Sequence, residues 1–211
     1  MEKRLIAAAL FSVSLILSCK TVKEEIIEIP KAPPAGVLIR QFGEDYRLDP
    51  GGTSLVPLSK APFELIFPVK PYNPSSKEFY AARIVATNDI ALVESFYQGL
   101  YIGLFPPMAP GSGLAGNEGP YETLYVVEYG SHYVIFDPED PDSQRGIRLG
   151  ERDGEVVLCW PIDKVMYQKK PYTMRTIPTK GFTLIIFIDK NLNEIVEKGE
   201  WYIADLRFTE F

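Results

Sequence analysis

The chain has 211 residues, with 28 aspartates and glutamates against 22 lysines and arginines, which gives a formal net charge of −6. This length suits one domain of ordinary size, and a hydrophobic content of 46% is enough to build its core. The acidic balance excludes a protein that binds nucleic acid through a broadly basic surface, so we expect no nucleic-acid partner.

The first 19 residues have the layout of an export signal. Lys3 and Arg4 precede an apolar run over residues 5–17, interrupted only by Ser12 and Ser14. A membrane-spanning helix needs roughly 20 apolar residues, whereas the hydrophobic region of a signal peptide is shorter. The run therefore predicts a signal peptide over residues 1–18.

The end of this run, Ile16-Leu17-Ser18-Cys19, resembles the lipobox of bacterial lipoproteins, although Ile16 and Leu17 stand where Leu and a small residue are usual. The resemblance implies cleavage before Cys19, a diacylglyceryl group on its thiol and an acylated amine, so that membrane lipid is the first expected partner. Lys20, rather than Asp, follows the cysteine, which by the same resemblance favours the outer membrane. The alternative is an ordinary cleaved secretory signal.

Residues 19–36 predict a tether behind the lipidated cysteine. They mix charges with Pro30, Pro33 and Pro34, and they end in Gly36. Such a segment is semi-rigid near its prolines, and it reaches at most about 55–60 Å at ~3.3–3.6 Å per residue.

Residues 37–211 predict one β-rich globular domain. The first candidate strands lie at 37–42, 55–58, 62–69 and 79–86, with a turn at residues 49–52. Five prolines between Pro57 and Pro74 favour edge strands or irregular crossings in this part, because proline cannot donate to a strand ladder.

One helix is predicted over residues 89–99. Apolar residues recur at helical spacing, Asp89 is one of the candidate N-caps, and Gly99 is a stop signal. A strand is the alternative, because residues 101–105 continue in a β-like composition. Residues 106–120 hold too many prolines and glycines for regular structure, and a loop of that length is usually functional or disordered.

Turn signals make the second half a series of hairpins. Gly130-Ser131 separates candidate strands 123–129 and 132–136, and Asp153-Gly154, a type I′ pair, separates 147–152 from 155–160. Candidate strands 182–188, 193–197 and 201–208 form a meander. We therefore predict a mainly β fold: a single antiparallel β-sandwich or small barrel with at most one or two short helices.

Residues 189–200 place oxygen donors at loop positions 1, 3, 5, 9 and 12, namely Asp189, Asn191, Asn193, Glu197 and Glu200. The spacing resembles an EF-hand loop and implies Ca²⁺, which takes six to eight oxygen ligands. Position 6 should be Gly but is Glu194, and the flanking segments read as strands. An Asp/Asn-rich turn without metal explains the same residues, because short polar side chains bond their own backbone.

Residues 164–180 form a cationic segment that contains no acidic side chain. Its basic residues are Lys164, Lys169, Lys170, Arg175 and Lys180. The segment predicts contact with lipid headgroups, anionic glycan or the acidic face of an envelope protein. The alternative is a solvated loop.

The sequence offers few catalytic candidates. Cys159 lies in an apolar run without a basic neighbour, which predicts a small buried hydrophobe rather than a reactive thiol. His132 is the one histidine, and no metalloprotease, nucleophile-elbow or phosphate-loop motif is present. A pair of carboxylates brought together by the fold remains open as a hydrolytic site.

These observations predict a lipid-anchored envelope protein whose β-rich domain binds or associates structurally and needs no cofactor beyond its lipid. Tyrosines such as Tyr97 and Tyr101, the group Tyr121, Tyr125 and Tyr129, and Tyr133 would line a groove for sugar or lipid, or else pack in the core. The alternatives are a hydrolase of envelope glycan or peptide and a surface adhesin or antigen. The sequence does not choose between the periplasmic and the surface face of the outer membrane.

Overall fold

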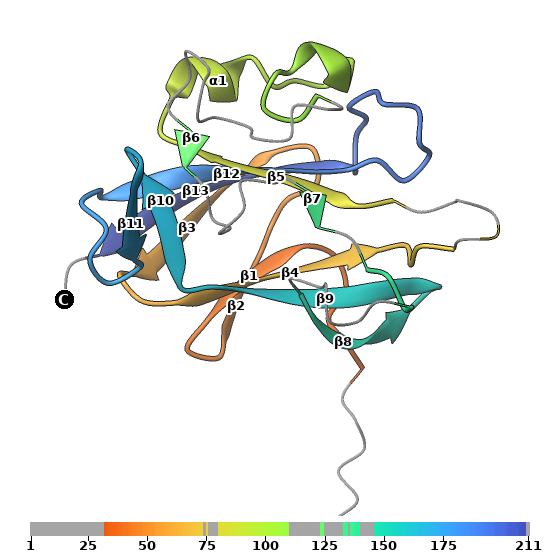
Figure 1. The fold of residues 1–211 in the computed structure, drawn as a ribbon, viewed down its shortest axis with the longest axis horizontal. Helices are drawn as coiled ribbons and strands as arrows, with labels where there is room; N and C mark the ends of the chain where they lie inside the picture. Colours follow the sequence, from red (N-terminus) through yellow and green to blue (C-terminus); the bar gives the residue numbers. More distant parts are fainter. Residues whose placement is uncertain are drawn as a thin grey trace, which may run out of the picture. The chain divides into compact units, whose positions relative to one another are not determined.

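The computed structural model describes residues 32–73, 75, 80–109, 123–124, 133–134, 136–139 and 146–209 (Figure 1). The chain divides into two compact units, Met1–Lys31 and Ala32–Phe211, and the described residues all belong to the second. Within them, no helix is long and apolar enough to cross a membrane.

A five-stranded antiparallel sheet forms one layer of this unit. Its strand order is β2-β1-β4-β9-β8. The strands are β1 (Leu38–Gln41), β2 (Glu44–Arg47), β4 (Phe63–Val69), β8 (Ile147–Arg152) and β9 (Glu155–Ile162). β8 and β9 are joined by the tight turn predicted at Asp153-Gly154, whereas the hairpin of β1 and β2 was not predicted.

A six-stranded sheet forms the second layer, in the order β3-β13-β12-β5, with β6 and β7 both paired to the free edge of β5. The strands are β3 (Thr53–Ser59), β5 (Ala82–Thr87), β6 (Thr123–Leu124), β7 (Tyr133–Val134), β12 (Gly181–Ile188) and β13 (Trp201–Thr209). All pairs are antiparallel except β13 with β3, which is parallel. A separate hairpin, β10 (Lys164–Tyr167) and β11 (Lys170–Thr173), stands apart from both sheets.

The two sheets lie face to face with the main core between them (Figure 1). β3 shows the reason in its sequence: Ser54, Val56 and Leu58 are buried while the residues between them are exposed or half-buried, because side chains alternate across a strand. Residues such as Leu65 of β4 and Leu184 of β12 meet in this core from opposite sheets. The sheets stay open, so the fold is the sandwich-like form of the predicted architecture.

A second apolar layer covers the outer face of the six-stranded sheet. The helix α1 (Ile90–Glu94) and the 3-10 turn η1 (Ile102–Leu104) lie over β5 and β12 (Figure 1). Asp89 caps α1 as predicted, accepting hydrogen bonds from the backbone N–H groups of Ala91 and Leu92 at 2.9 and 3.3 Å. The helix is shorter than the predicted 89–99. It ends at Glu94, and the chain continues in irregular structure to Gly99, whose φ is +92°.

The hairpin at Asp153-Gly154 is confirmed. Both residues have positive φ, 55° and 80°, and Arg152 faces Glu155 in the ladder, which is the type I′ geometry. The hairpin predicted across Gly130-Ser131 is not formed by the described residues. β6 and β7 both run antiparallel to β5, so they run in the same direction, whereas the arms of a hairpin run in opposite directions.

The prediction that proline-containing segments form edge strands is confirmed for β3 and wrong for β4. β3, with Pro57, lies at a sheet edge. β4 is an inner strand, but Pro68 lies beyond Ile66, the last residue opposite β1, so its missing N–H breaks no bond to that neighbour. Residues 193–197 form no strand. Only Ile195 makes an isolated bridge, to Tyr101, so the predicted three-stranded meander is a two-strand pair joined by a loop.

Candidate functional site

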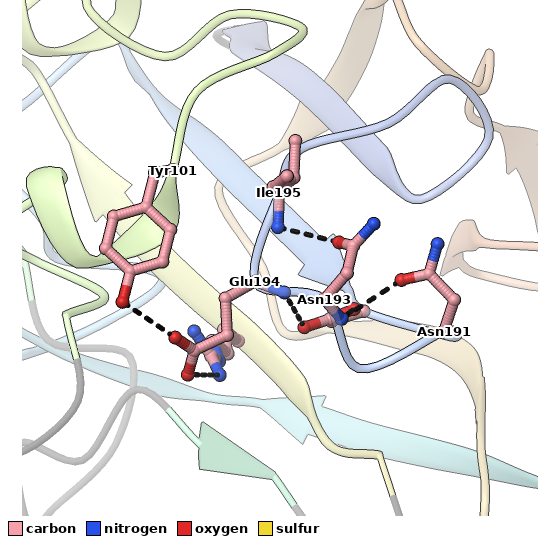
Figure 2. Close-up of polar contacts among 7 residues, drawn as sticks. Tyr101, Asn191, Asn193, Glu194 and Ile195 are labelled. Carbon is pink, nitrogen blue, oxygen red and sulfur yellow. Dashed lines mark hydrogen bonds and ion pairs between the residues drawn. The ribbon is translucent and has the colours of Figure 1, made fainter.

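The loop of residues 189–200, which we call the β12–β13 loop, is the densest polar cluster in the described chain. Asp189 begins it and is only 5% exposed. Its Oδ1 accepts from the N–H of Asn193 at 3.2 Å and its Oδ2 from the N–H of Glu194 at 2.9 Å (Figure 2). Both carboxylate oxygens therefore shape the loop backbone.

The two asparagines continue this pattern. The Oδ1 of Asn191 accepts from the N–H of Asn193 at 3.1 Å, and the Oδ1 of Asn193 accepts from the N–H of Ile195 at 2.8 Å. Their Nδ2 groups donate to the two oxygens of Glu197 at 2.8 and 3.2 Å. These are turns stabilised by side chains, the metal-free alternative that the sequence already offered.

Glu200 closes the loop and is buried, with 7% of its surface exposed. Its Oε1 accepts from the N–H of Lys190 at 2.9 Å, while its Oε2 is buried without a hydrogen-bond partner. Burial raises the pKa of Glu200, and the charges of Asp189 and Glu197 raise it further. A carboxylate with an unsatisfied buried oxygen is costly when ionised.

The loop thus brings together all five residues predicted to bind Ca²⁺. The left-handed turn that Gly provides at position 6 of an EF-hand is made here by Glu194 itself, with φ +59°. However, no group of three or more His, Cys, Asp and Glu side chains is placed to hold a metal anywhere in the described residues. Most of the loop's polar side-chain atoms bond within the loop, and Ca²⁺ binding stays a prediction.

Glu194 also joins the loop to the outer layer. Its Oε2 accepts from the hydroxyl of Tyr101 at 3.0 Å, which raises the pKa of Tyr101, and its Oε1 lies 4.0 Å from Arg83 (Figure 2). Backbone bonds reinforce the contact: the N–H of Ile102 donates to the carbonyl of Glu194 at 2.8 Å. Sequence reasoning did not single out Arg83 or Glu194 for this contact, because Tyr101 and Glu194 are 93 residues apart.

A second polar contact links the two sheets beside this loop. The Nζ of Lys190, which follows β12, lies 2.8 Å from Oε1 of Glu155 at the start of β9, and the hydroxyl of Tyr80 donates to the same oxygen. Burial and this hydrogen bond raise the pKa of Tyr80. Sequence reasoning could not find this trio, since its members come from three distant segments.

The cationic segment folds into the β10–β11 hairpin and the turn after it. Lys164, Lys169, Lys170, Arg175 and Lys180 are all exposed. Val165, Met174 and Ile177, which lie between them, are buried in the main core. The structure therefore fixes the backbone of this segment while its five basic side chains reach solvent.

Cys159 is confirmed as a buried small hydrophobe. It is 4% exposed and packs with Leu38, Ile66 and Val157 in a small cluster separate from the main core. Burial, with a smaller contribution from Glu64, raises the pKa of the thiol to about 11, so it stays protonated near neutral pH.

The remaining predicted positions divide in two groups. Tyr97 and Tyr101 are exposed at 55% and 47%, so they do not pack in the core. Outside the described residues lie Cys19, His132, Tyr121, Tyr125 and Tyr129 and most of the loop 106–120, and the side chain of Tyr133 is likewise not described.

Comparison with protein-family models gives no match, and comparisons with curated protein sequences and with solved structures give no significant match.

Proposed function

We propose that this chain is a lipid-anchored protein of the bacterial cell envelope, whose β-sandwich acts by binding or by structural association rather than by catalysis. The observation that carries the proposal is the order of features in the first 19 residues: Lys3 and Arg4, a short apolar run, and Cys19 at its end.

The proline-containing tether supports the same function. Residues 19–36 connect the proposed anchor to the folded unit, and two or more acyl chains hold a protein at a membrane far better than one. The tether would let the domain work at a distance from the bilayer. Its partners would be envelope proteins, glycan or lipid, with the outer membrane as the favoured location.

Replacing Cys19 by Ser tests the anchor. Cells that express the full chain are grown with a labelled fatty acid and then fractionated. We expect the natural chain to carry label in the membrane fraction and Cys19→Ser to carry none. Cys159→Ser is the matched control, because it removes the other cysteine of the chain, and it should keep both label and location. Label that survives Cys19→Ser would overturn the proposal.

A hydrolase of envelope glycan or peptide is the alternative from a different class. The observation that bears on it is buried Glu200 beside the carboxylates of Asp189 and Glu197. Burial raises the pKa of Glu200, and a carboxylic acid with a raised pKa can act as the general acid of glycoside hydrolysis. Both oxygens of Asp189 already accept backbone N–H groups, which favours a structural role. Release of fragments from purified envelope glycan, abolished by Glu200→Gln, would support the hydrolase.

The other alternative is a surface adhesin or antigen. Protease treatment of intact cells distinguishes the cell surface from the periplasm. Cleavage of the folded unit in intact cells places it on the surface, and cleavage only after the outer membrane is opened places it in the periplasm.

A further inference from the structure

We propose that the β10–β11 hairpin is a docking element that binds the anionic phospholipid surface of a membrane. This inference rests on the proposed function in one respect, because the lipid anchor would hold the hairpin within reach of the bilayer. The remaining support comes from the charges, exposure and backbone geometry of the hairpin itself.

The first observation is an imbalance of charge. The segment 164–180 carries five basic residues and no acidic one, while the whole chain carries −6. Subtracting these five charges from the net charge leaves −11 for the rest of the chain. An anionic surface would therefore attract the hairpin and repel the remainder, which orients the domain with the hairpin toward the membrane.

The second observation concerns the ion pairing of four of these five cations. In the described part of the chain, Lys169, Lys170, Arg175 and Lys180 form no ion pair. Several basic residues elsewhere are paired: Arg40 with Asp45 at 2.6 Å, Lys190 with Glu155 at 2.8 Å and Arg207 with Asp205 at 2.7 Å. A cation without a carboxylate neighbour keeps its full charge for an outside partner.

The third observation is the tip of the hairpin. Gln168 and Lys169 form its two-residue turn, and both have left-handed φ values, 49° and 61°. Type I′ turns usually use Asn-Gly, so two longer side chains here cost roughly 1 kcal/mol or more each in backbone strain. The strained turn places Lys169 and Lys170 side by side at the exposed end.

The hairpin is held rigidly behind this tip. Val165 of β10 faces Tyr172 of β11, and both pack against the main core, as does Tyr167. The rings of Tyr167 and Tyr172 lie 6.4 Å apart and are half-buried. Tyrosine is favoured where an apolar ring meets the polar headgroup level of a membrane.

A planar lipid surface suits this shape better than a single anionic molecule does. The cations stand on a hairpin that pairs with neither sheet and on the turn that follows it (Figure 1). Binding one small anion tightly needs a concave set of donors, whereas exposed lysines interact with any of many equivalent lipid phosphates. An anionic polysaccharide is the competing partner that the test must separate.

The test uses the full lipidated protein reconstituted in vesicles of phosphatidylcholine alone or mixed with phosphatidylglycerol. Lysine acetylation is followed by mass spectrometry. At low salt we expect Lys169 and Lys170 to react roughly fivefold more slowly in the mixed vesicles, and the difference should vanish near 1 M salt, where the Debye length is about 3 Å. Lys198, exposed in the β12–β13 loop, is the internal control and should react equally in both.

A charge-reversed variant sharpens the result. With Lys169→Glu and Lys170→Glu together, Lys164 and Lys180 should react at the same rate in both kinds of vesicle. Equal rates for Lys169 and Lys170 in the natural chain, or equal slowing at Lys198, would overturn the proposal. Protection that appears only when an anionic polysaccharide is added to phosphatidylcholine vesicles would also overturn it.

The mass of the N-terminal peptide in the same samples separates this proposal from the proposed function. If Cys19 carries no lipid, the anchor fails. Flotation of the unlipidated protein then tests the hairpin. Flotation with phosphatidylglycerol vesicles but not with phosphatidylcholine vesicles supports docking. Flotation with neither or with both overturns it.

Discussion

The buried carboxylate of Glu200 gives the sharpest prediction, through the substitution Glu200→Gln. In the natural chain Oε1 is bonded to the N–H of Lys190, whereas Oε2 is buried without a partner. The negative charges of Asp189 and Glu197 also disfavour the ionised carboxylate. A glutamine keeps an oxygen for the first bond and places an uncharged N–H₂ donor where repulsion now acts.

The magnitude follows from the unsatisfied oxygen. Leaving a buried polar atom unpaired costs about 1–3 kcal/mol, and more when it is charged. The glutamine removes the charge but still leaves a polar group buried at that position, so the gain is only the difference between the charged and the neutral cost. We therefore expect Glu200→Gln to raise the free energy of unfolding by about 1 kcal/mol at pH 8. Most substitutions destabilise, so a gain of this size at a buried site would be diagnostic.

The gain should depend on pH in one direction. Because the pKa of Glu200 is raised in the folded state above its ordinary value of 4.5, the protonated side chain favours folding. That contribution is complete below the ordinary pKa and is lost as pH rises through the raised one. The side chain of the variant does not titrate. Its advantage in free energy of unfolding over the natural chain should therefore be small near pH 4 and should grow as the pH rises.

Urea unfolding followed by tryptophan fluorescence measures this difference at pH 4 and pH 8. Glu197→Gln is the matched control. Glu197 is exposed and accepts from the amides of Asn191 and Asn193, so its neutralisation should bring no gain. A Glu200→Gln variant that is less stable than the natural chain at pH 8, or equally improved at both pH values, would refute the reasoning.

Three further predictions concern the same strands and loop. Asp189→Ala should lower the free energy of unfolding by about 2 kcal/mol, because the N–H of Glu194 loses its charged acceptor; a loss below half of that would contradict the assigned role. Gly181→Ala should cost about 3 kcal/mol, since an added Cβ would lie 2.0 Å from the carbonyl oxygen of Leu206. In the control, Gly154→Ala, the added Cβ would have no atom within 4 Å, so the substitution should cost only about 1 kcal/mol, for its positive φ. Equal losses in the two variants would contradict the steric argument. Because the oxygens of Asp189 and Glu197 already accept hydrogen bonds within the β12–β13 loop, Ca²⁺ or chelator should leave the melting temperature unchanged. A rise with Ca²⁺ that Glu200→Gln abolishes would instead support the predicted metal site.

Local geometry explains where sequence reasoning succeeded. The turn at Asp153-Gly154 depends on the φ values of two adjacent residues, and the cap at Asp89 depends on one side chain and the next N–H groups. Such features can be predicted because every atom that determines them lies within a few residues.

Pairing between distant segments had no such signal. The parallel contact of β13 with β3, the common direction of β6 and β7, and the placement of Pro68 beyond its neighbour's end depend on how two sheets cover one another. Many pairings bury the same apolar residues, so the hydrophobic pattern does not choose among them.

The sequence by itself determined the composition of the cationic segment, the mainly β class and the oxygen-rich spacing of residues 189–200, and it predicts an export signal. Only the tertiary structure decided what that spacing does. It turned Glu194 toward Tyr101 and Arg83 and left one oxygen of Glu200 buried without a partner. The physical reason is that burial and long-range contacts fix a side chain's partners and pKa, and both arise only when segments far apart in the chain pack together.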